Sequence, residues 1–153
     1  MTSSATCAMP AASSGRLRRD LLVDTSVAVP LVVADHEHHP SVTRALGRRR
    51  LGLAGHAAFE TFSVLTRLPS PARRDPSVVE QILRTGFPLT RFLGADDARG
   101  LLGRLAPLGI AGGAVYDALV GQVAVAHRLA LATRDARAVD VYRALDVDVE
   151  LID

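Results

Sequence analysis

The chain contains no lysine, no asparagine and no tryptophan, and all 18 of its basic residues are arginines. Without lysine it cannot form a Walker-A phosphate site, a Schiff base or a Ser-Lys dyad. It also lacks the lysine that we expect in phosphotransfer sites of the receiver or dehalogenase kind, which likewise place an acidic pocket on an α/β sheet. The missing lysine therefore excludes several common enzyme classes before any motif is considered.

Aromatic residues and cysteine are scarce. Only 4% of the residues are Phe, Trp or Tyr, which argues against nucleic-acid binding by stacking of bases on aromatic side chains. The single cysteine, Cys7, excludes an internal disulfide and a zinc site made of thiolates, and it is typical of a reducing compartment. No apolar run approaches the roughly 20 residues that cross a bilayer, and residues 1–19 lack the apolar centre of a signal peptide. We expect a cytoplasmic protein without a membrane segment.

The length of 153 residues fits one domain with a sizeable core. Residues 1–19, rich in Ala and Ser, are expected to form a flexible extension, and residues 20–153 a single domain. We expect strands at 21–23, 51–53, 89–93, 129–133 and 147–152, and helices at 26–35, 40–48, 56–68, 78–84, 96–105, 114–127 and 136–145. Pro30 falls near the start of the first helix, where proline is tolerated. The alternation of strands and helices predicts an α/β fold with a central parallel sheet flanked by helices in three layers.

Four acidic residues stand where an apolar strand ends or a helix begins: Asp24 in LLVDTS, Glu60 in HAAFETFSVLTRL, Asp117 in GGAVYDALVGQVA and Asp135 in LATRDARAV. In a parallel α/β fold these positions gather along one edge of the sheet, so the four carboxylates can meet there. Clustered carboxylates repel one another unless a positive group lies among them, and a hard divalent cation such as Mg²⁺ is the usual solution. The four acids together indicate metal-dependent phosphoryl chemistry.

Each acid also has a local explanation. Asp24 and Asp135 stand where Asp often caps a helix, and Asp117 in a first turn complements the helix dipole. Glu60 could be a solvated helix residue with His56 one turn before it. The nearby hydroxyls could either orient metal ligands and waters or cap the chain locally; they belong to Thr25, Ser26 and Thr133.

Several strings together resemble a known family. The strings DTS after the first strand, AAFETFSVLTRLP in a helix, YDALVGQVA at the start of a later helix and LATRDARA at a strand end resemble PIN-domain ribonucleases. More narrowly, they resemble the VapC toxins of bacterial toxin–antitoxin pairs. The similarity covers about residues 20–153, and the strings YDAL and ETFSVLTRLP are more specific than DTS.

The resemblance implies a PIN-type fold and an endoribonuclease that uses Mg²⁺ or Mn²⁺ to hydrolyse RNA with water. Asp24 and Asp117 would be the main metal ligands, and Glu60 and Asp135 would complete the catalytic pocket. Asp140 could share or replace the role of Asp135, which we prefer because it directly follows a strand. The resemblance further implies a homodimer and a VapB-like antitoxin that docks on an apolar groove and presents a basic residue to the acidic pocket.

Other functions and sites stay open. The same fold could serve as a non-catalytic RNA-binding or antitoxin-binding module, or a related fold as a metal-dependent DNA nuclease. The histidines of the HEHH stretch, His36, His38 and His39, suit a transition metal, but without a second cluster a solvated loop is the favoured interpretation. The arginines at 48–50 and 73–74 are candidate phosphate contacts or a solubilising surface. A net charge of +2 permits a polyanionic partner without requiring one.

Overall fold

A computed structural model describes residues 20–153, and the predicted N-terminal extension, residues 1–19, lies outside the described residues. The elements in chain order are β1 (Asp20–Val23), α1 (Thr25–Val32), α2 (His39–Leu46), β2 (Arg50–Leu53), α3 (His56–Arg67), α4 (Pro76–Gly86), α5 (Ala95–Leu105), α6 (Ala114–His127), β3 (Leu131–Thr133), α7 (Val139–Ala144) and β4 (Val149–Leu151). In this part of the chain no helix is long and apolar enough to cross a membrane.

The four strands form one parallel sheet in the order β2-β1-β3-β4. The chain moves from β1 to β2 on one side and then returns to build β3 and β4 on the other. This reversal places the carboxyl ends of β1 and β3 side by side, which is where open α/β sheets bind their ligands. The predicted α/β fold with a central parallel sheet is therefore confirmed.

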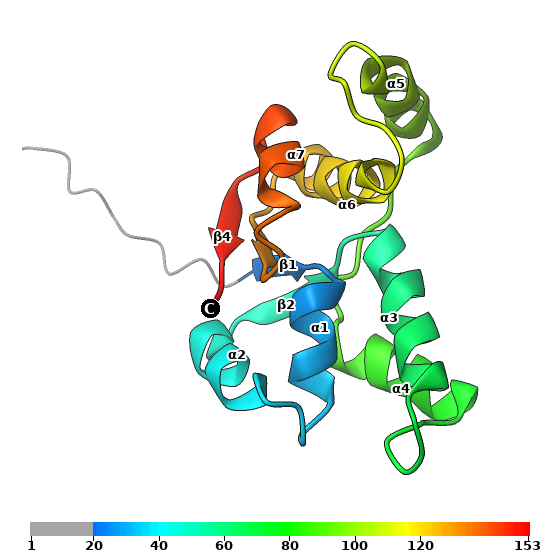
Figure 1. The fold of residues 1–153 in the computed structure, drawn as a ribbon, viewed down its shortest axis with the longest axis vertical. Helices are drawn as coiled ribbons and strands as arrows, with labels where there is room; N and C mark the ends of the chain where they lie inside the picture. Colours follow the sequence, from blue (N-terminus) through cyan, green and yellow to red (C-terminus); the bar gives the residue numbers. More distant parts are fainter. Residues whose placement is uncertain (1–19) are drawn as a thin grey trace, which may run out of the picture.

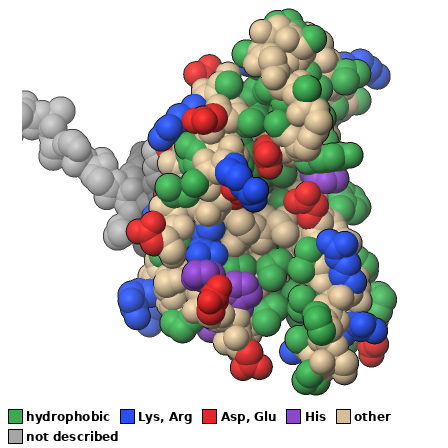
Figure 2. Space-filling view, in the orientation of Figure 1, with side chains coloured by type: hydrophobic (Ala, Val, Ile, Leu, Met, Phe, Trp, Pro, Cys, Tyr) green, Lys and Arg blue, Asp and Glu red, His purple; other side chains and the backbone are tan. Residues whose placement is uncertain are grey.

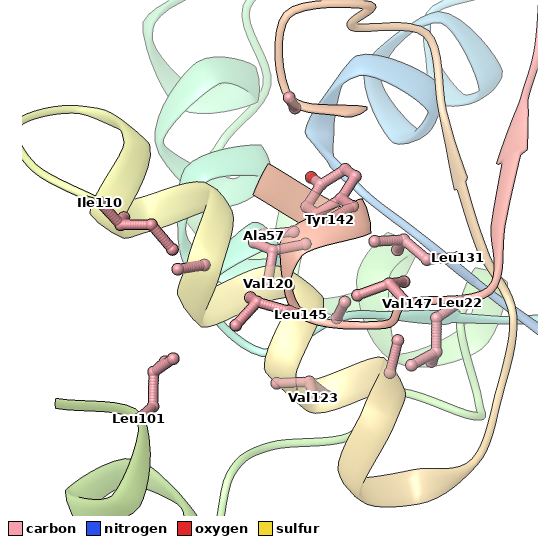
Figure 3. Close-up of a cluster of buried hydrophobic side chains, with 14 residues drawn as sticks. Leu22, Ala57, Leu101, Ile110, Val120, Val123, Leu131, Tyr142, Leu145 and Val147 are labelled. Carbon is pink, nitrogen blue, oxygen red and sulfur yellow. The ribbon is translucent and has the colours of Figure 1, made fainter. Parts of the chain in front are cut away.

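Helices cover both faces of the sheet because the strand side chains alternate between two cores. Leu21 and Val23 of β1 pack with apolar residues of α1 and α2, whereas Leu22 packs with α6 and α7. Figure 1 shows α6 and α7 on one side of β1 and β2, and α1 and α2 on the other. Figure 3 shows the α6–α7 core, where the ring of Tyr142 lies among aliphatic side chains. The burial of both faces explains why the strands read as continuous apolar runs.

The predicted strand at 89–93 is wrong. This segment runs beside β2, where the N–H groups of Leu89 and Arg91 donate to the carbonyls of Leu51 and Leu53, but only one isolated bridge, Ala54 with Arg91, is formed. The Leu53 N–H donates instead to the hydroxyl of Thr90 at 3.0 Å. Because a side-chain oxygen takes the place of a backbone carbonyl, the ladder is interrupted and no fifth strand results.

The start of the last helix and the place of Pro30 within the first helix both differ from prediction. The helix expected at 136–145 begins only at Val139, because the preceding residues form a turn. Pro30 lies well inside α1, which begins at Thr25, so it removes one intrahelical hydrogen bond. The Pro30 carbonyl accepts a hydrogen bond from Nδ1 of His39 at 2.8 Å, which ties α1 to α2.

Gly52 in β2 sets how closely the 89–91 segment can approach. A Cβ at this position would lie 2.3 Å from the backbone carbon and oxygen of Leu89. We therefore expect Gly52→Ala to lower the free energy of unfolding by about 1–3 kcal/mol, the usual cost of overpacking. Urea unfolding followed by circular dichroism measures this change. The matched control is Gly100→Ala in α5, where a Cβ meets nothing within 4 Å and a gain in stability is expected. Equal free energies of unfolding for the two variants would contradict the close packing of Leu89 against Gly52.

Candidate active site

The four predicted acids come from four different elements. Asp24 directly follows β1, and Asp135 lies two residues beyond β3. Glu60 is in the second turn of α3, and Asp117 is in the first turn of α6. The charges of Asp24, Glu60 and Asp135 each act on Asp117 strongly enough to raise its pKa, so the four groups share one pocket. Figure 2 shows acidic side chains beside a histidine on the face where α3 and α6 approach each other.

Asp24 is the buried centre of this pocket, with only 6% of its surface exposed. Its Oδ1 accepts a hydrogen bond from the Ser26 hydroxyl at 2.5 Å, and its Oδ2 accepts one from the Tyr142 hydroxyl at 3.1 Å. Burial raises the pKa of Asp24, while hydrogen bonds from Ser26, Thr133 and Tyr142 oppose that rise. Asp24 stands at the N-cap of α1 but makes no side-chain cap. Its carboxylate is therefore directed into the pocket, and the capping alternative does not describe it.

Asp117 is the acid most affected by its neighbours. Partial burial is the main cause that raises its pKa, followed by repulsion from Asp135, Asp24 and Glu60; Arg137 lowers it. A carboxylate in this setting is stabilised by a proton or by a cation. The local sequence around Asp117 offers no basic residue, and the positive charge that acts on it comes from beyond β3. The pocket therefore has more negative charge than its own residues neutralise.

Glu60 and Asp135 are held by partners at the rim. The Thr25 hydroxyl donates to Oε2 of Glu60 at 2.8 Å, and Nε2 of His56 lies 3.6 Å from Oε1 of the same residue. Oδ1 of Asp135 accepts the Arg137 N–H at 3.0 Å, so this acid does organise the turn before α7. Asp135 does not cap a helix, because the N-cap residue of α7 is Ala138; its carboxylate bonds a turn and also acts on Asp117.

The predicted hydroxyls join the ends of the two central strands. Ser26 Oγ accepts the Arg134 N–H at 2.7 Å and lies 3.4 Å from Oγ1 of Thr133. Thr133 Oγ1 in turn accepts the Asp135 N–H at 3.0 Å. Ser26 and Thr133 thus orient Asp24 and Asp135 at the same time.

Sequence reasoning missed Tyr142 and Arg137. Tyr142 is 1% exposed, and its pKa is raised by burial and by the charge of Asp24, which keeps the hydroxyl protonated as a donor. A signal was present, because a tyrosine in the apolar stripe of a helix needs a buried partner for its hydroxyl. Arg137 gave no signal, since nothing in its local sequence distinguishes it from the other arginines.

Asp140, the alternative to Asp135, lies elsewhere. Its side chain is 93% exposed on α7 and pairs with Arg143 at 3.9 Å. It is not among the groups that raise the pKa of Asp117. The structure therefore places Asp135 at the pocket and Asp140 on the surface.

A divalent cation suits the chemistry of this donor set. The carboxylates are hard oxygen ligands, and the raised pKa of Asp117 reflects negative charge that a cation would offset. Among residues 20–153, however, no three His, Cys, Asp or Glu side chains are already gathered as a cage for a metal ion. That Asp24 and Asp117 hold a cation, with Glu60 and Asp135 beside them, stays a prediction.

The other polar clusters have structural partners. His39 is bonded to the Pro30 carbonyl, and the rings of His36 and His38 lie 5.6 Å apart without a third ligand within the described region. The solvated-loop interpretation of the HEHH stretch is the one that fits. Side chains of Arg73 and Arg74 donate to backbone carbonyls of their own loop, and Arg49 pairs with Glu150. These arginines stabilise the fold.

The fold is similar to that of several solved structures. VapBC2 from Rickettsia felis, bound to a DNA fragment from its promoter, matches 88% of this chain and 99% of its own chain, with a TM-score of 0.64 at 14% identity. Mycobacterium tuberculosis VapC20, described as a Sarcin-Ricin loop cleaving toxin, matches 78% of this chain and 93% of its own chain, with a TM-score of 0.62 at 19% identity. FitAcB from Neisseria gonorrhoeae matches 84% of this chain and 95% of its own chain, with a TM-score of 0.59 at 19% identity. At these identities the likeness concerns the fold alone.

Sequence comparison is more specific. The PIN-domain profile matches residues 21–144. Ribonuclease VapC27 of M. tuberculosis is 45% identical over 133 residues, which cover 87% of this chain and 97% of the relative. Ribonuclease VapC40 of the same species is 47% identical over 131 residues, 84% of this chain and 96% of the relative. The profile match and these near full-length identities confirm the resemblance seen in the sequence: the chain belongs to the PIN-domain family and, within it, to the VapC group.

Proposed function

We propose that this protein is a metal-dependent endoribonuclease that hydrolyses RNA as the toxin of a toxin–antitoxin pair in the cytoplasm. One observation carries the proposal: burial and then the charges of Asp135, Asp24 and Glu60 raise the pKa of Asp117, so acids from distant parts of the chain lie near one another. The relatives at 45–47% identity are named ribonucleases, which gives the pocket its substrate class. Residues 20–153 form the proposed nuclease domain.

The proposed cofactor is Mg²⁺, with Mn²⁺ as an equivalent. When bound, it supplies the positive charge that holds the scissile phosphate and activates water for attack. Asp24 and Asp117 hold the cation, while Glu60 and Asp135 bind it or the water. Ser26 and Tyr142 orient Asp24 by donating to both of its oxygens, and these hydrogen bonds favour its ionised form against the effect of burial. The chain has no Lys, and the proposal needs no Ser, Cys or Lys nucleophile, so these acids carry the chemistry.

The proposed partners are RNA, a VapB-like antitoxin and a second copy of the chain in a homodimer. All four phenylalanines of the chain line a groove of about 440 Å³ between α3 and α4, namely Phe59, Phe62, Phe87 and Phe92. Phe59 is 66% and Phe92 52% exposed, so this apolar surface is the one that supports the predicted docking of an antitoxin. Its position beside Glu60 on α3 suits a partner that also reaches the acidic pocket.

A non-catalytic module is the second candidate. Both oxygens of Asp24 already accept hydrogen bonds, and within residues 20–153 no metal cage is preassembled. A protein that only bound RNA or an antitoxin would need neither cation nor turnover. The two functions differ in what Mg²⁺ does, and the first experiment below separates them.

Replacement of the central acids should abolish cleavage. We expect Asp24→Asn and Asp117→Asn each to lower the rate of Mg²⁺-dependent cleavage of structured RNA by about a hundredfold or more, because each removes a charge that holds the cation. Gel analysis of RNA products with Mg²⁺, with Mn²⁺ and with EDTA measures this.

The matched control is Asp140→Asn, an exposed acid of α7 that should cleave like wild type. Cleavage that is equal in wild type and both pocket variants would point to contamination and contradict the proposal. Single-stranded, duplex and flap DNA offered in parallel test the DNA-nuclease alternative.

The raised pKa of Asp117 predicts a pH-dependent cost to stability. Since the folded protein binds this proton more tightly than the unfolded chain, the stabilisation is present below the ordinary pKa of Asp and is lost as pH rises through the raised pKa. Metal-free Asp117→Asn should therefore melt at a higher temperature than wild type at neutral pH, and the difference should shrink towards about pH 4.

Differential scanning fluorimetry measures both this difference and the effect of Mg²⁺. Mg²⁺ should raise the melting temperature of wild type more than that of Asp117→Asn, because the cation binds the folded wild type more tightly. The control Asp140→Asn should follow wild type at every pH. A metal-free Asp117→Asn that melts below wild type at neutral pH would show that repulsion in the pocket is unimportant.

Tyr142 is predicted to act through Asp24. Tyr142→Phe keeps the buried ring but removes the donor to Oδ2, so Asp24 should hold the cation less well. We expect the Mg²⁺ concentration for half-maximal cleavage to rise by about tenfold to a hundredfold, the usual effect of removing a partner of a metal ligand. Titration of cleavage with Mg²⁺, and of Mn²⁺ binding by calorimetry, measures this. Thr66→Ala, which removes a hydroxyl bonded within α3, is the control, and an unchanged Mg²⁺ requirement in Tyr142→Phe would exclude the positioning role.

A further inference from the structure

An aromatic pair lies at the rim of the acidic pocket and has no part in the chemistry described above. The ring of Tyr116 stacks on the ring of His56, with centroids 4.9 Å apart and an interplanar angle of 18°. Tyr116 directly precedes Asp117 in α6, and His56 is the first residue of α3. The two residues are far apart in the chain, and the fold brings them together only at this edge.

The pair is accessible and held in place. Tyr116 is 53% exposed, whereas the other tyrosine of the chain is buried. The His56 side chain is 31% exposed, and its Nε2 lies 3.6 Å from Oε1 of Glu60. Glu60 is itself fixed by the Thr25 hydroxyl. The exposed ring therefore belongs to the same connected set of side chains as the pocket acids.

A cavity of about 430 Å³ is lined by His56 of this pair, though not by Tyr116, and by Glu60 of the four acids. Its lining includes Thr25, His56 and Glu60 on the pocket side and Arg67 on the far side. It thus combines an aromatic wall, two groups of the acidic pocket and one guanidinium. A nucleotide carries the complementary features, a flat base and a phosphate that an arginine can bind.

We propose that the His56–Tyr116 pair is a platform on which an unpaired nucleobase next to the scissile phosphate stacks. This inference rests on the proposed ribonuclease function. Proteins recognise single-stranded RNA by stacking bases on tyrosine and histidine rings, and every base offers a face for such stacking. Nε2 of His56 lies 3.6 Å from Oε1 of Glu60, so a base stacked on the pair would lie next to a pocket acid. The low aromatic content of the chain argued against stacking, yet one of its few aromatic rings lies at the site where stacking would matter.

Binding is best measured where RNA stays intact, in the Asp24→Asn background with Mg²⁺. The probes are single-stranded octaribonucleotides that carry one 2-aminopurine, whose fluorescence falls when the base stacks on an aromatic ring. We expect Tyr116→Ala to weaken binding by about tenfold, within the range for loss of one stacked base, and to remove the quenching. Tyr116→Phe keeps a ring and should retain both. The matched control is Leu102→Ala on α5, an apolar side chain that is 73% exposed and should change neither.

Cleavage kinetics in the otherwise wild-type protein give a second readout. Tyr116→Ala should raise KM by about tenfold with kcat nearly unchanged, since the stack contributes to binding and not to the reacting bonds. Circular dichroism confirms that each variant is folded.

The outcomes separate the two proposals. Wild type that cleaves RNA, combined with unchanged affinity and quenching in Tyr116→Ala, would overturn the platform and leave the nuclease intact. Loss of binding to an antitoxin without loss of RNA affinity would likewise overturn it and assign the pair to a partner surface. Absence of cleavage by wild type on any RNA would overturn the proposed function, while the fluorescence titration would still report whether the base stacks.

Discussion

The burial of carboxylates near one another is the constraint on which the site depends: burial raises the pKa of Asp24, and burial with the charges of Asp135, Asp24 and Glu60 raises that of Asp117. Asp24 is nearly excluded from water, and a carboxylate in that position is costly unless donors surround it. Ser26 and Tyr142 supply those donors from α1 and α7. Helices on both faces of the sheet therefore donate hydrogen bonds that favour the ionised form of one buried acid against the effect of its burial.

The sheet order makes this arrangement possible. Because β1 and β3 are neighbours, the loops that follow them meet, and the hydroxyls of Ser26 and Thr133 join them directly. Glu60 then enters from the second turn of α3 and Asp117 from the first turn of α6. Asp117 lies at the positive end of its helix dipole, which lowers the cost of placing a carboxylate there.

The helix α3 connects the acidic pocket to the apolar groove. Glu60 faces the pocket, Phe62 lines the groove, and Phe59 borders both the groove and the cavity beside His56. Successive residues of one helix point to different sides, so a single element serves a polar and an apolar surface. Because both surfaces share α3, a partner bound in the groove would lie next to a substrate bound at the acidic pocket.

Much of the fold and of the site could be predicted from the sequence. The parallel sheet, its helices and the four acids follow from apolar runs, from turn residues and from the strings shared with the family. Two local predictions failed because they depended on neighbours. The 89–93 segment lost its strand pairing to the hydroxyl of Thr90, and the last helix begins later because Asp135 organises a turn before it.

Local sequence determined which residues end strands and begin helices, since periodicity and capping act within a few positions. It left helix capping open for Asp24 and Asp135, and Asp140 open as an alternative to Asp135. Only the tertiary structure decided that Tyr142 reaches Asp24 across 118 residues, that Asp140 faces solvent, and that His56 stacks on Tyr116. The physical reason is that burial, repulsion and stacking depend on distance in space, which the strand order sets and the spacing along the chain does not.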